Sequence, residues 1–200
     1  SATKFNLRVG LEGNGMDRMV VAALFAENPV AQDVVITEAI RNLDIVIKRI
    51  PDTIVRRVGP HSYGRQVGFA AGLADAALAS RQISAQDRTA IKEKIARICY
   101  LITDPNYWSI EKGNVGLNPN MTTMAYAYRV TFAALIPSHP MSKRWLKSGL
   151  AEIKREIDEW TDPAGGMQEC PHYSMLILDH WLGACLVARN AGSPEAGHLF

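Results

Sequence analysis

A chain of 200 residues is long enough to bury a hydrophobic core as one ordinary domain. Its 22 Lys and Arg residues nearly balance its 20 Asp and Glu residues, and no five like charges follow one another, which argues against a nucleic-acid partner. The apolar runs are short and interrupted by charges, which argues against a membrane partner, and no basic-then-apolar signal segment opens the chain.

Apolar residues recur every three or four positions over most of the length, and the alternation typical of strands is nearly absent. The sequence therefore predicts a single all-α domain over residues 1–200. Asn28-Pro29 and Pro51 are expected to bracket the second helix, and Ser84 with Asp87 resembles a capping box at the start of the fourth. The predicted helices span residues 17–28, 31–50, 64–80, 85–103, 119–136, 142–161 and 171–191.

Short turns between long helices predict antiparallel neighbours, so the first six helices form three hairpins and the helix 171–191 is left over. No sequence repeat of fixed period occurs, which argues against the common repeat arrays. An unpaired last helix indicates a piece of a larger helical array. We therefore expect apolar helix surface to stay uncovered at an open end, where a second copy of the chain or additional domains would pack.

Two connections are longer than a turn requires. They are PNYWSIEKGNVGLNPN, residues 105–120, and TDPAGGMQECP, residues 161–171. Long irregular loops on a helical scaffold are frequent sites of function. The helices that follow these loops should run in the same direction in an antiparallel array, so we expect both loops to lie at one end of it and to line one concave face.

The candidate catalytic residues come from these loops and the helix starts beside them. Asn118 or Asn120 serves first as an N-cap, but two such residues exceed the need for one cap, and amide donors at a helix start suit a carboxylate ligand. Glu169 either favours the helix dipole or takes part in a reaction site. His172 is either an exposed residue at a helix start or part of a reaction site. Tyr173 is either an aromatic residue of the core or a group that exchanges protons with a substrate.

A phenol that acts as a base needs a neighbour that favours phenolate or accepts its proton, and His172 or Arg129 is a candidate for this role. Tyr107 and Trp108 either pack in the first loop or stack on a sugar ring. The predicted helix 64–80 should run in the same direction as the helices 119–136 and 171–191, so its start should lie at the same end as the two long loops. His61, Tyr63 and Arg65 at this start are secondary candidates for substrate binding.

No metal and no cofactor is expected. Cys170, His172 and His180 do not match the spacing of a standard zinc set. Cys99, Cys170 and Cys185 are odd in number and lack CxxC spacing, so no disulfide framework is predicted.

The segment from Asn118 to Leu176 resembles the helical domain of heparinase II/III-like polysaccharide lyases and related alginate lyases. The shared pattern is an Asn-bearing helix start, a hairpin, an Asp and a Gly pair, then a Glu and then a Tyr that opens the next helix. Upstream of this segment only the general helical character is similar. The chain departs from the family pattern because Pro119 and Met121 stand where a His commonly accompanies the Asn, and because it lacks the β-sandwich domains that usually follow.

The resemblance implies an incomplete (α/α) toroid that belongs to a longer lyase-like chain. It also implies β-elimination on a uronic-acid polysaccharide or oligosaccharide, and a periplasmic or secreted bacterial location. By position, Asn118 or Asn120 would neutralise the uronate carboxylate, Tyr173 would transfer the protons, and Glu169 would shape the site.

Two alternatives remain. One is a glycoside hydrolase on a similar helical barrel, with Glu169 and either Asp162 or Asp179 as acid and base. The other is a helical scaffold or glycan-binding module without catalysis, in which Tyr173 is dispensable. An unsaturated sugar product distinguishes elimination from hydrolysis.

Overall fold

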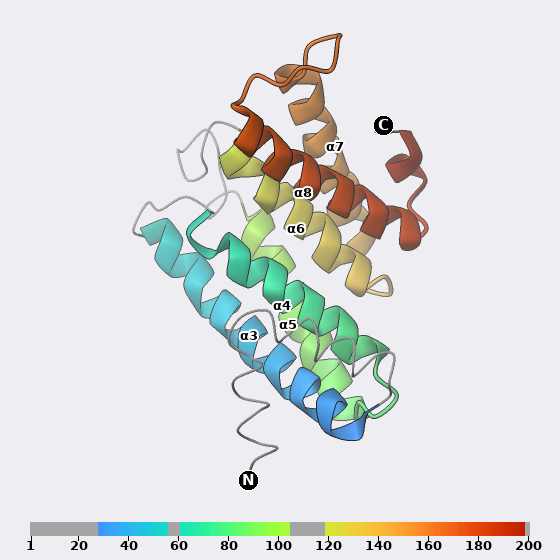
Figure 1. Cartoon of the computed structure of the whole chain (residues 1–200). Helices are drawn as coiled ribbons and strands as arrows, with labels where there is room; N and C mark the ends of the chain where they lie inside the picture. The colour runs from blue at the N-terminus through green and yellow to red at the C-terminus, as the bar shows by residue number, and fades with distance from the viewer. Residues whose placement is uncertain (1–27, 56–60, 105–118, 199–200) are drawn as a thin grey trace.

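The computed structural model describes residues 28–55, 61–104 and 119–198, and within them all regular structure is helical (Figure 1). The predicted all-α class is confirmed. Thr161 and Met167 form an isolated β-bridge in the loop between two helices. The helices are α3 (Pro29–Val55), α4 (His61–Ala79), α5 (Ala85–Thr103), α6 (Pro119–Leu135), α7 (Ser142–Trp160), α8 (Pro171–Asn190) and the short 3-10 helix η1 (Pro194–His198). The predicted helix 17–28 lies outside the described residues.

The helix boundaries agree with the predicted ones within a few residues, with one error at Pro51. The predicted start of α5 is confirmed, because the backbone N–H of Asp87 donates to Ser84 Oγ at 3.0 Å. Pro51 was expected to end a helix, but α3 continues through it to Val55. Burial of Ile50 and Val46 on the apolar side of α3 stabilises the helix up to the proline. Tertiary packing therefore outweighs the loss of one backbone hydrogen bond at Pro51.

The helices form two layers. Figure 1 shows α4, α6 and α8 running in one direction, with α6 between the other two, while α3, α5 and α7 run the opposite way. α6 packs on α4, α5, α7 and α8. Its buried side chains include Phe132 and Val130, which are fully enclosed. α6 is therefore the central element on which the other helices are organised.

The predicted pairing of helices into sequential hairpins is wrong for α4 and α5. These two helices touch little, and each packs instead on α3 and α6. The reason lies in the apolar residues of α4, which are mostly alanines: Ala70, Ala74 and Ala77 are fully buried. Small side chains allow close approach to two neighbours at once, so α4 packs between α3 and α6 rather than against the next helix in sequence.

Two glycines on different helix faces give a stability prediction. A Cβ built on Gly149 of α7 would lie 2.6 Å from Val130 Cγ2 and 3.2 Å from the Tyr126 carbonyl oxygen, whereas a Cβ on Gly183 of α8 would meet nothing within 4 Å. We expect Gly149→Ala to destabilise the fold by about 1–3 kcal/mol through overpacking. We expect Gly183→Ala to stabilise it by about 0.5–1 kcal/mol through helix propensity. Denaturant unfolding of both variants measures this, and a Gly149→Ala variant as stable as the wild type would contradict the α6–α7 contact.

α8 carries most of the large apolar side chains that the described part of the chain leaves exposed. They are Tyr173, Met175, Leu176, Leu178, Leu182 and Leu186. The expectation that the last helix leaves apolar surface uncovered is confirmed. That a second copy or further domains cover this surface stays a prediction, and light scattering tests it: a monomer at all concentrations that binds no hydrophobic dye would contradict it. Among the described helices, none is long and apolar enough to span a membrane.

Candidate functional site

The starts of α4, α6 and α8 lie at the same end of the helical layer. This follows from their common direction in Figure 1 and from the packing of α6 against both neighbours. Each helix start leaves backbone N–H groups without an intrahelical partner and carries the positive end of the helix dipole. The expectation that α6 and α8 begin at one end is confirmed. This end therefore combines donors from three helices.

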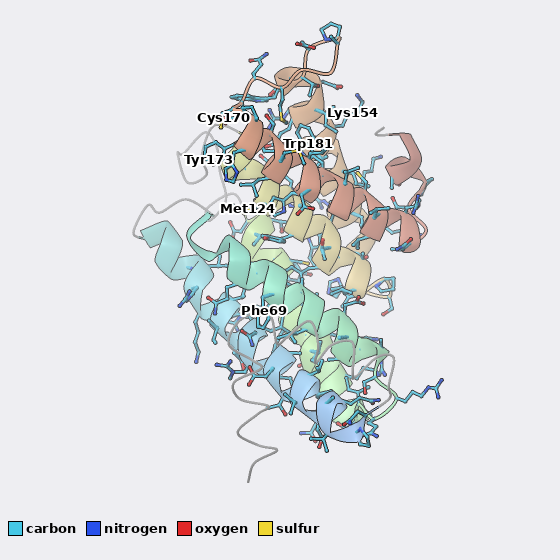
Figure 2. All side chains as sticks on the ribbon, in the orientation of Figure 1. Phe69, Met124, Lys154, Cys170, Tyr173 and Trp181 are labelled. Carbon is cyan, nitrogen blue, oxygen red and sulfur yellow. The ribbon has the colours of Figure 1, made fainter. Side chains whose placement is uncertain are left out.

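Tyr173 and His172 occupy the first turn of α8 at this end (Figure 2). Pro171 begins the helix at the first position, where a missing N–H costs nothing. The Tyr173 side chain is 43% exposed, and its ring centroid lies 5.5 Å from that of His172. Among the described residues, its hydroxyl has no hydrogen-bond partner. The phenol and the imidazole are neighbours that are both accessible from solvent.

The loop before α8 folds back on itself, which explains the glycine pair GG at 165–166. Gly165 adopts a positive φ of 85°, and the Gly166 N–H donates to Asp162 Oδ1 at 2.9 Å. A Cβ on Gly166 would lie 2.5 Å from Asp162 Oδ2. Gly165 is therefore required by the backbone of the turn, and a side chain at 166 would displace the Asp162 carboxylate that the turn uses. The carboxylate of Asp162 also accepts a hydrogen bond from the Ala164 N–H at 2.8 Å. Asp162, one of the two acids considered for the hydrolase alternative, therefore stabilises this turn.

Glu169 and Cys170 connect this turn to α8. The Glu169 carbonyl accepts from Ser174 Oγ at 3.2 Å, and Cys170 occupies the N-cap position without a side-chain hydrogen bond. The Glu169 side chain is half-buried and has no ion pair among the described residues. It lies four positions before Tyr173, at the same end of the layer.

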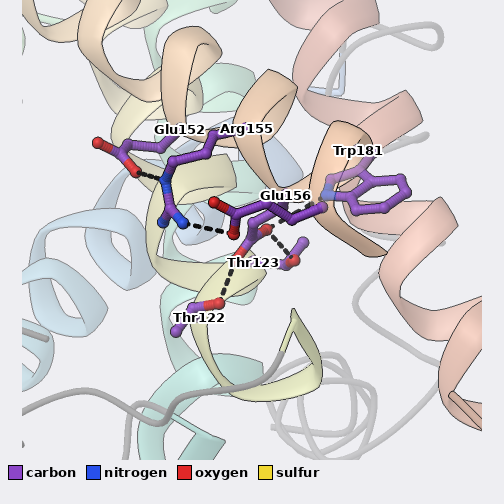
Figure 3. Close-up of polar contacts among 7 residues, drawn as sticks. Thr122, Thr123, Glu152, Arg155, Glu156 and Trp181 are labelled. Atoms are coloured by element: carbon purple, nitrogen blue, oxygen red, sulfur yellow. Dashed lines mark hydrogen bonds and ion pairs between the residues drawn. The ribbon is translucent and has the colours of Figure 1, made fainter. Parts of the chain in front are cut away.

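A buried carboxylate that the sequence did not single out links α7 to this end. Glu156 of α7 is 2% exposed and accepts hydrogen bonds from the hydroxyls of Thr122 and Thr123, in the first turns of α6. It also accepts from Trp181 Nε1 of α8 at 3.4 Å (Figure 3). Burial raises the pKa of Glu156, and the hydrogen bonds from the two threonines and the tryptophan lower it in part.

The signal for Glu156 was present in the sequence. On α7 the buried side follows Trp145, Leu146, Leu150 and Ile153, and Glu156 continues that spacing. An acid in line with an apolar stripe is costly unless hydrogen bonds satisfy it. It therefore predicts a buried polar contact rather than a surface residue. Here the contact holds the start of α6 against the middle of α8.

Arg129 has no contact with Tyr173 in the structure. It lies on the buried side of α6, where Nη2 donates to the Ile102 carbonyl at 3.1 Å and the guanidinium carbon lies 5.6 Å from the centre of the Tyr126 ring. Burial lowers the pKa of Arg129. The structure therefore does not bring Arg129 to Tyr173, and His172 is the candidate that remains beside the phenol.

The other predicted site residues are described in part or not at all. The backbones of His61, Tyr63 and Arg65 lie in the first turn or so of α4, and that of Asn120 in the first turn of α6, all at the end that carries Tyr173. Their side chains are outside the described part of the structure. Tyr107, Trp108 and Asn118 lie outside the described residues altogether, as does most of the first long loop, so the expectation that both loops line one concave face stays a prediction. Asp179 of the hydrolase alternative lies deeper along α8, two turns after its start, and His180 of the zinc set that the spacing did not support lies beside it.

Comparison of the chain with known protein families, with curated proteins and with solved structures finds no significant match. Its function is therefore argued from the arrangement of its own residues.

Proposed function

We propose that this chain is a polysaccharide-lyase-like helical domain that cleaves uronic-acid-containing glycans by β-elimination. The observation that carries the proposal is the shared end of α4, α6 and α8, where three helix starts lie side by side and the start of α8 carries the exposed Tyr173 and His172. The two layers of oppositely directed helices support an incomplete (α/α) toroid as the architecture, in which α4, α6 and α8 form one wall.

The first requirement of β-elimination is a site for the substrate carboxylate. A proton on the carbon beside that carboxylate leaves only if the enolate-like charge that develops is stabilised. Helix starts supply N–H donors and a positive dipole end for this purpose. In the proposal Asn118 or Asn120, at the start of α6, adds side-chain amide donors to the same carboxylate.

The second requirement is a group that moves protons. The Tyr173 phenolate would remove the proton from C5, the electron pair of that bond would form the C4–C5 double bond, and the C4–O bond would break. The phenol would then return the proton to the leaving oxygen. His172, whose ring centroid lies 5.5 Å from that of Tyr173, would take the phenol proton through a water before the first turnover, and each later turnover regenerates the phenolate. Glu169 would shape the site, while Tyr107, Trp108, His61, Tyr63 and Arg65 would contact neighbouring sugars.

Glu156 has a positioning role in this proposal. It contacts neither substrate nor the reacting atoms, but it receives hydrogen bonds from the start of α6 and the middle of α8 and so fixes the position of α8 relative to the start of α6. A shift of about 1 Å between a proton-transfer group and a charge-stabilising group is enough to slow a reaction strongly.

The test is incubation of the chain with a panel of alginate, heparan-type and other uronate polymers in the presence of a chelator. The expected result is an unsaturated product detected by its ultraviolet absorbance. New reducing ends without that absorbance would show that the chain hydrolyses the polymer and does not cleave it by elimination. Polymer binding without any product would make the chain a glycan-binding module, and either outcome overturns the proposal.

A further inference from the structure

A second feature of the α4–α6–α8 layer is a cleft of about 590 Å³, away from the end that carries Tyr173. Glycine and alanine from all three helices form much of its floor, including Gly68, Gly72, Ala127, Ala134 and Gly183. A Cβ added to Gly72 or Gly183 would meet no atom within 4 Å. The cleft is therefore open space with a smooth apolar floor, and its volume is in the range of small-molecule sites.

Polar groups from each helix converge on this cleft. They are Asp75 of α4, Tyr128 and Thr131 of α6, and Asp179, His180 and Asn190 of α8. The ring of His180 packs edge-on against that of Tyr128, with centroids 5.9 Å apart. Burial raises the pKa of Tyr128 to about 12, so the phenol keeps its proton, and burial lowers the pKa of His180, which favours the neutral imidazole.

The charged side chains that line the cleft are all acidic. Asp75 and Asp179 contribute two carboxylates from helices on its two sides, and no Lys or Arg is among its lining residues. Within the described part of the chain, neither carboxylate has a hydrogen bond or an ion pair. Two exposed acids of α7, by contrast, are neutralised locally: Asp158 pairs with Lys154 at 2.7 Å, and Glu159 with Arg155 at 2.7 Å. The cleft is therefore complementary to positive charge.

The positions of the two carboxylates favour an extended organic cation over a single metal ion. The described residues contain no set of three His, Cys, Asp or Glu side chains close enough to hold one metal ion, so Asp75, Asp179 and His180 do not converge on a single point. Asp75 and Asp179 lie on helices that pack on α6 from its two sides, so a ligand that contacts both carboxylates extends across the cleft. An aliphatic chain suits the glycine and alanine floor between them, and an ammonium group can also approach the face of an aromatic ring.

We propose that this cleft binds an aliphatic diamine or oligoamine, with one ammonium group at Asp75, another at Asp179, and the methylene chain over the floor formed by α6. The inference is independent of the proposed lyase activity. The two sites differ in charge preference: helix starts attract the anionic glycan, whereas the carboxylates of the cleft repel it.

The test is isothermal titration calorimetry of the whole chain with diaminobutane at low ionic strength, with butanediol as the uncharged probe of the same length. We expect diaminobutane to bind and butanediol not to bind. Asp179→Asn and Asp75→Asn should each weaken diaminobutane binding by about tenfold or more, because each removes one charge-assisted contact while preserving side-chain shape. Backbone amide signals of Gly72 and Gly183 should shift on titration in the wild-type protein.

The matched control is Asp158→Asn, which removes the same charge from an exposed position on α7. It should leave diaminobutane binding unchanged, so an equal loss in this variant would show attraction by net charge alone and overturn the proposal. Absent binding of diaminobutane, or equal binding of butanediol, would overturn it as well. Asp75 and Asp179 are both exposed, so both variants are expected to fold, and an unfolding curve of each checks this.

Discussion

Tyr173→Phe is expected to abolish elimination while leaving the fold intact. The substitution keeps the ring and removes the only titratable atom of the side chain. Because the side chain is 43% exposed and its hydroxyl has no hydrogen-bond partner among the described residues, the free energy of unfolding should change little. General acid–base groups contribute about 10²–10⁴-fold to a rate, and a residue that serves as base and then as acid belongs at the upper end of that range.

The measurement is kcat on the uronate polymer that the wild-type chain cleaves, together with the unfolding midpoint of each variant. Tyr100→Phe is the matched control, since Tyr100 is a similarly exposed tyrosine, on α5. It should retain full activity. Asn120→Ala should cost about 3 kcal/mol in the activation barrier, by analogy with the loss of one oxyanion donor. Activity retained in Tyr173→Phe would exclude the phenol as the proton carrier and make Glu169 the next residue to test.

The helices were predictable because their signals are local. Periodic apolar residues and the capping residue Ser84 identify α5, and Pro171 marks the start of α8, without reference to the rest of the chain. Pro51 was misassigned because its effect depends on tertiary packing: the apolar side of α3 remains buried up to Ile50. The pairing of α4 with α5 was wrong for the same reason, since the alanines of α4 pack equally well on several helices.

The candidate site was predictable only in its location. Counting helix directions is sufficient to place the starts of α6 and α8 at one end, and so to associate Asn120 with Tyr173 from the sequence alone. It cannot give side-chain contacts, which is why Arg129 was considered beside Tyr173 although it points into the core.

The cleft was not predictable. Its walls come from Asp75 and Asp179, more than a hundred positions apart, and its floor comes from glycines and alanines that carry no chemical signal of their own. A concave surface of this kind results from the packing of three helices and is not encoded in any one segment.

Glu156→Ala is expected to be the most destabilising single substitution among the polar residues discussed. It removes the acceptor for Thr122, Thr123 and Trp181 at a site that is 2% exposed. A buried donor without a partner costs about 1–3 kcal/mol, and the space left by the side chain adds a cavity cost, so the loss should be about 3 kcal/mol or more. Denaturant unfolding measures it.

Glu156→Gln separates the charge of this residue from its hydrogen bonds. Glutamine keeps an oxygen that accepts from Trp181 Nε1, so at neutral pH this variant should be about as stable as the wild type or more stable. Glu159→Gln, one turn away at an exposed position on α7, is the control for a change of charge without burial.

The pH dependence then follows from the pKa of Glu156. Burial raises that pKa in the folded chain above its ordinary value of 4.5, so the folded state binds the proton more tightly than the unfolded state does. The stabilisation from this group is fully present below the unfolded pKa and is lost as pH rises through the folded pKa. The stability of the wild type relative to Glu156→Gln should therefore fall as pH rises above about 4.5 and then level off. Unfolding curves at a series of pH values measure this difference. A difference that does not change with pH, or one that Glu159→Gln reproduces, would mean that the Glu156 carboxyl is not the buried link between α6, α7 and α8.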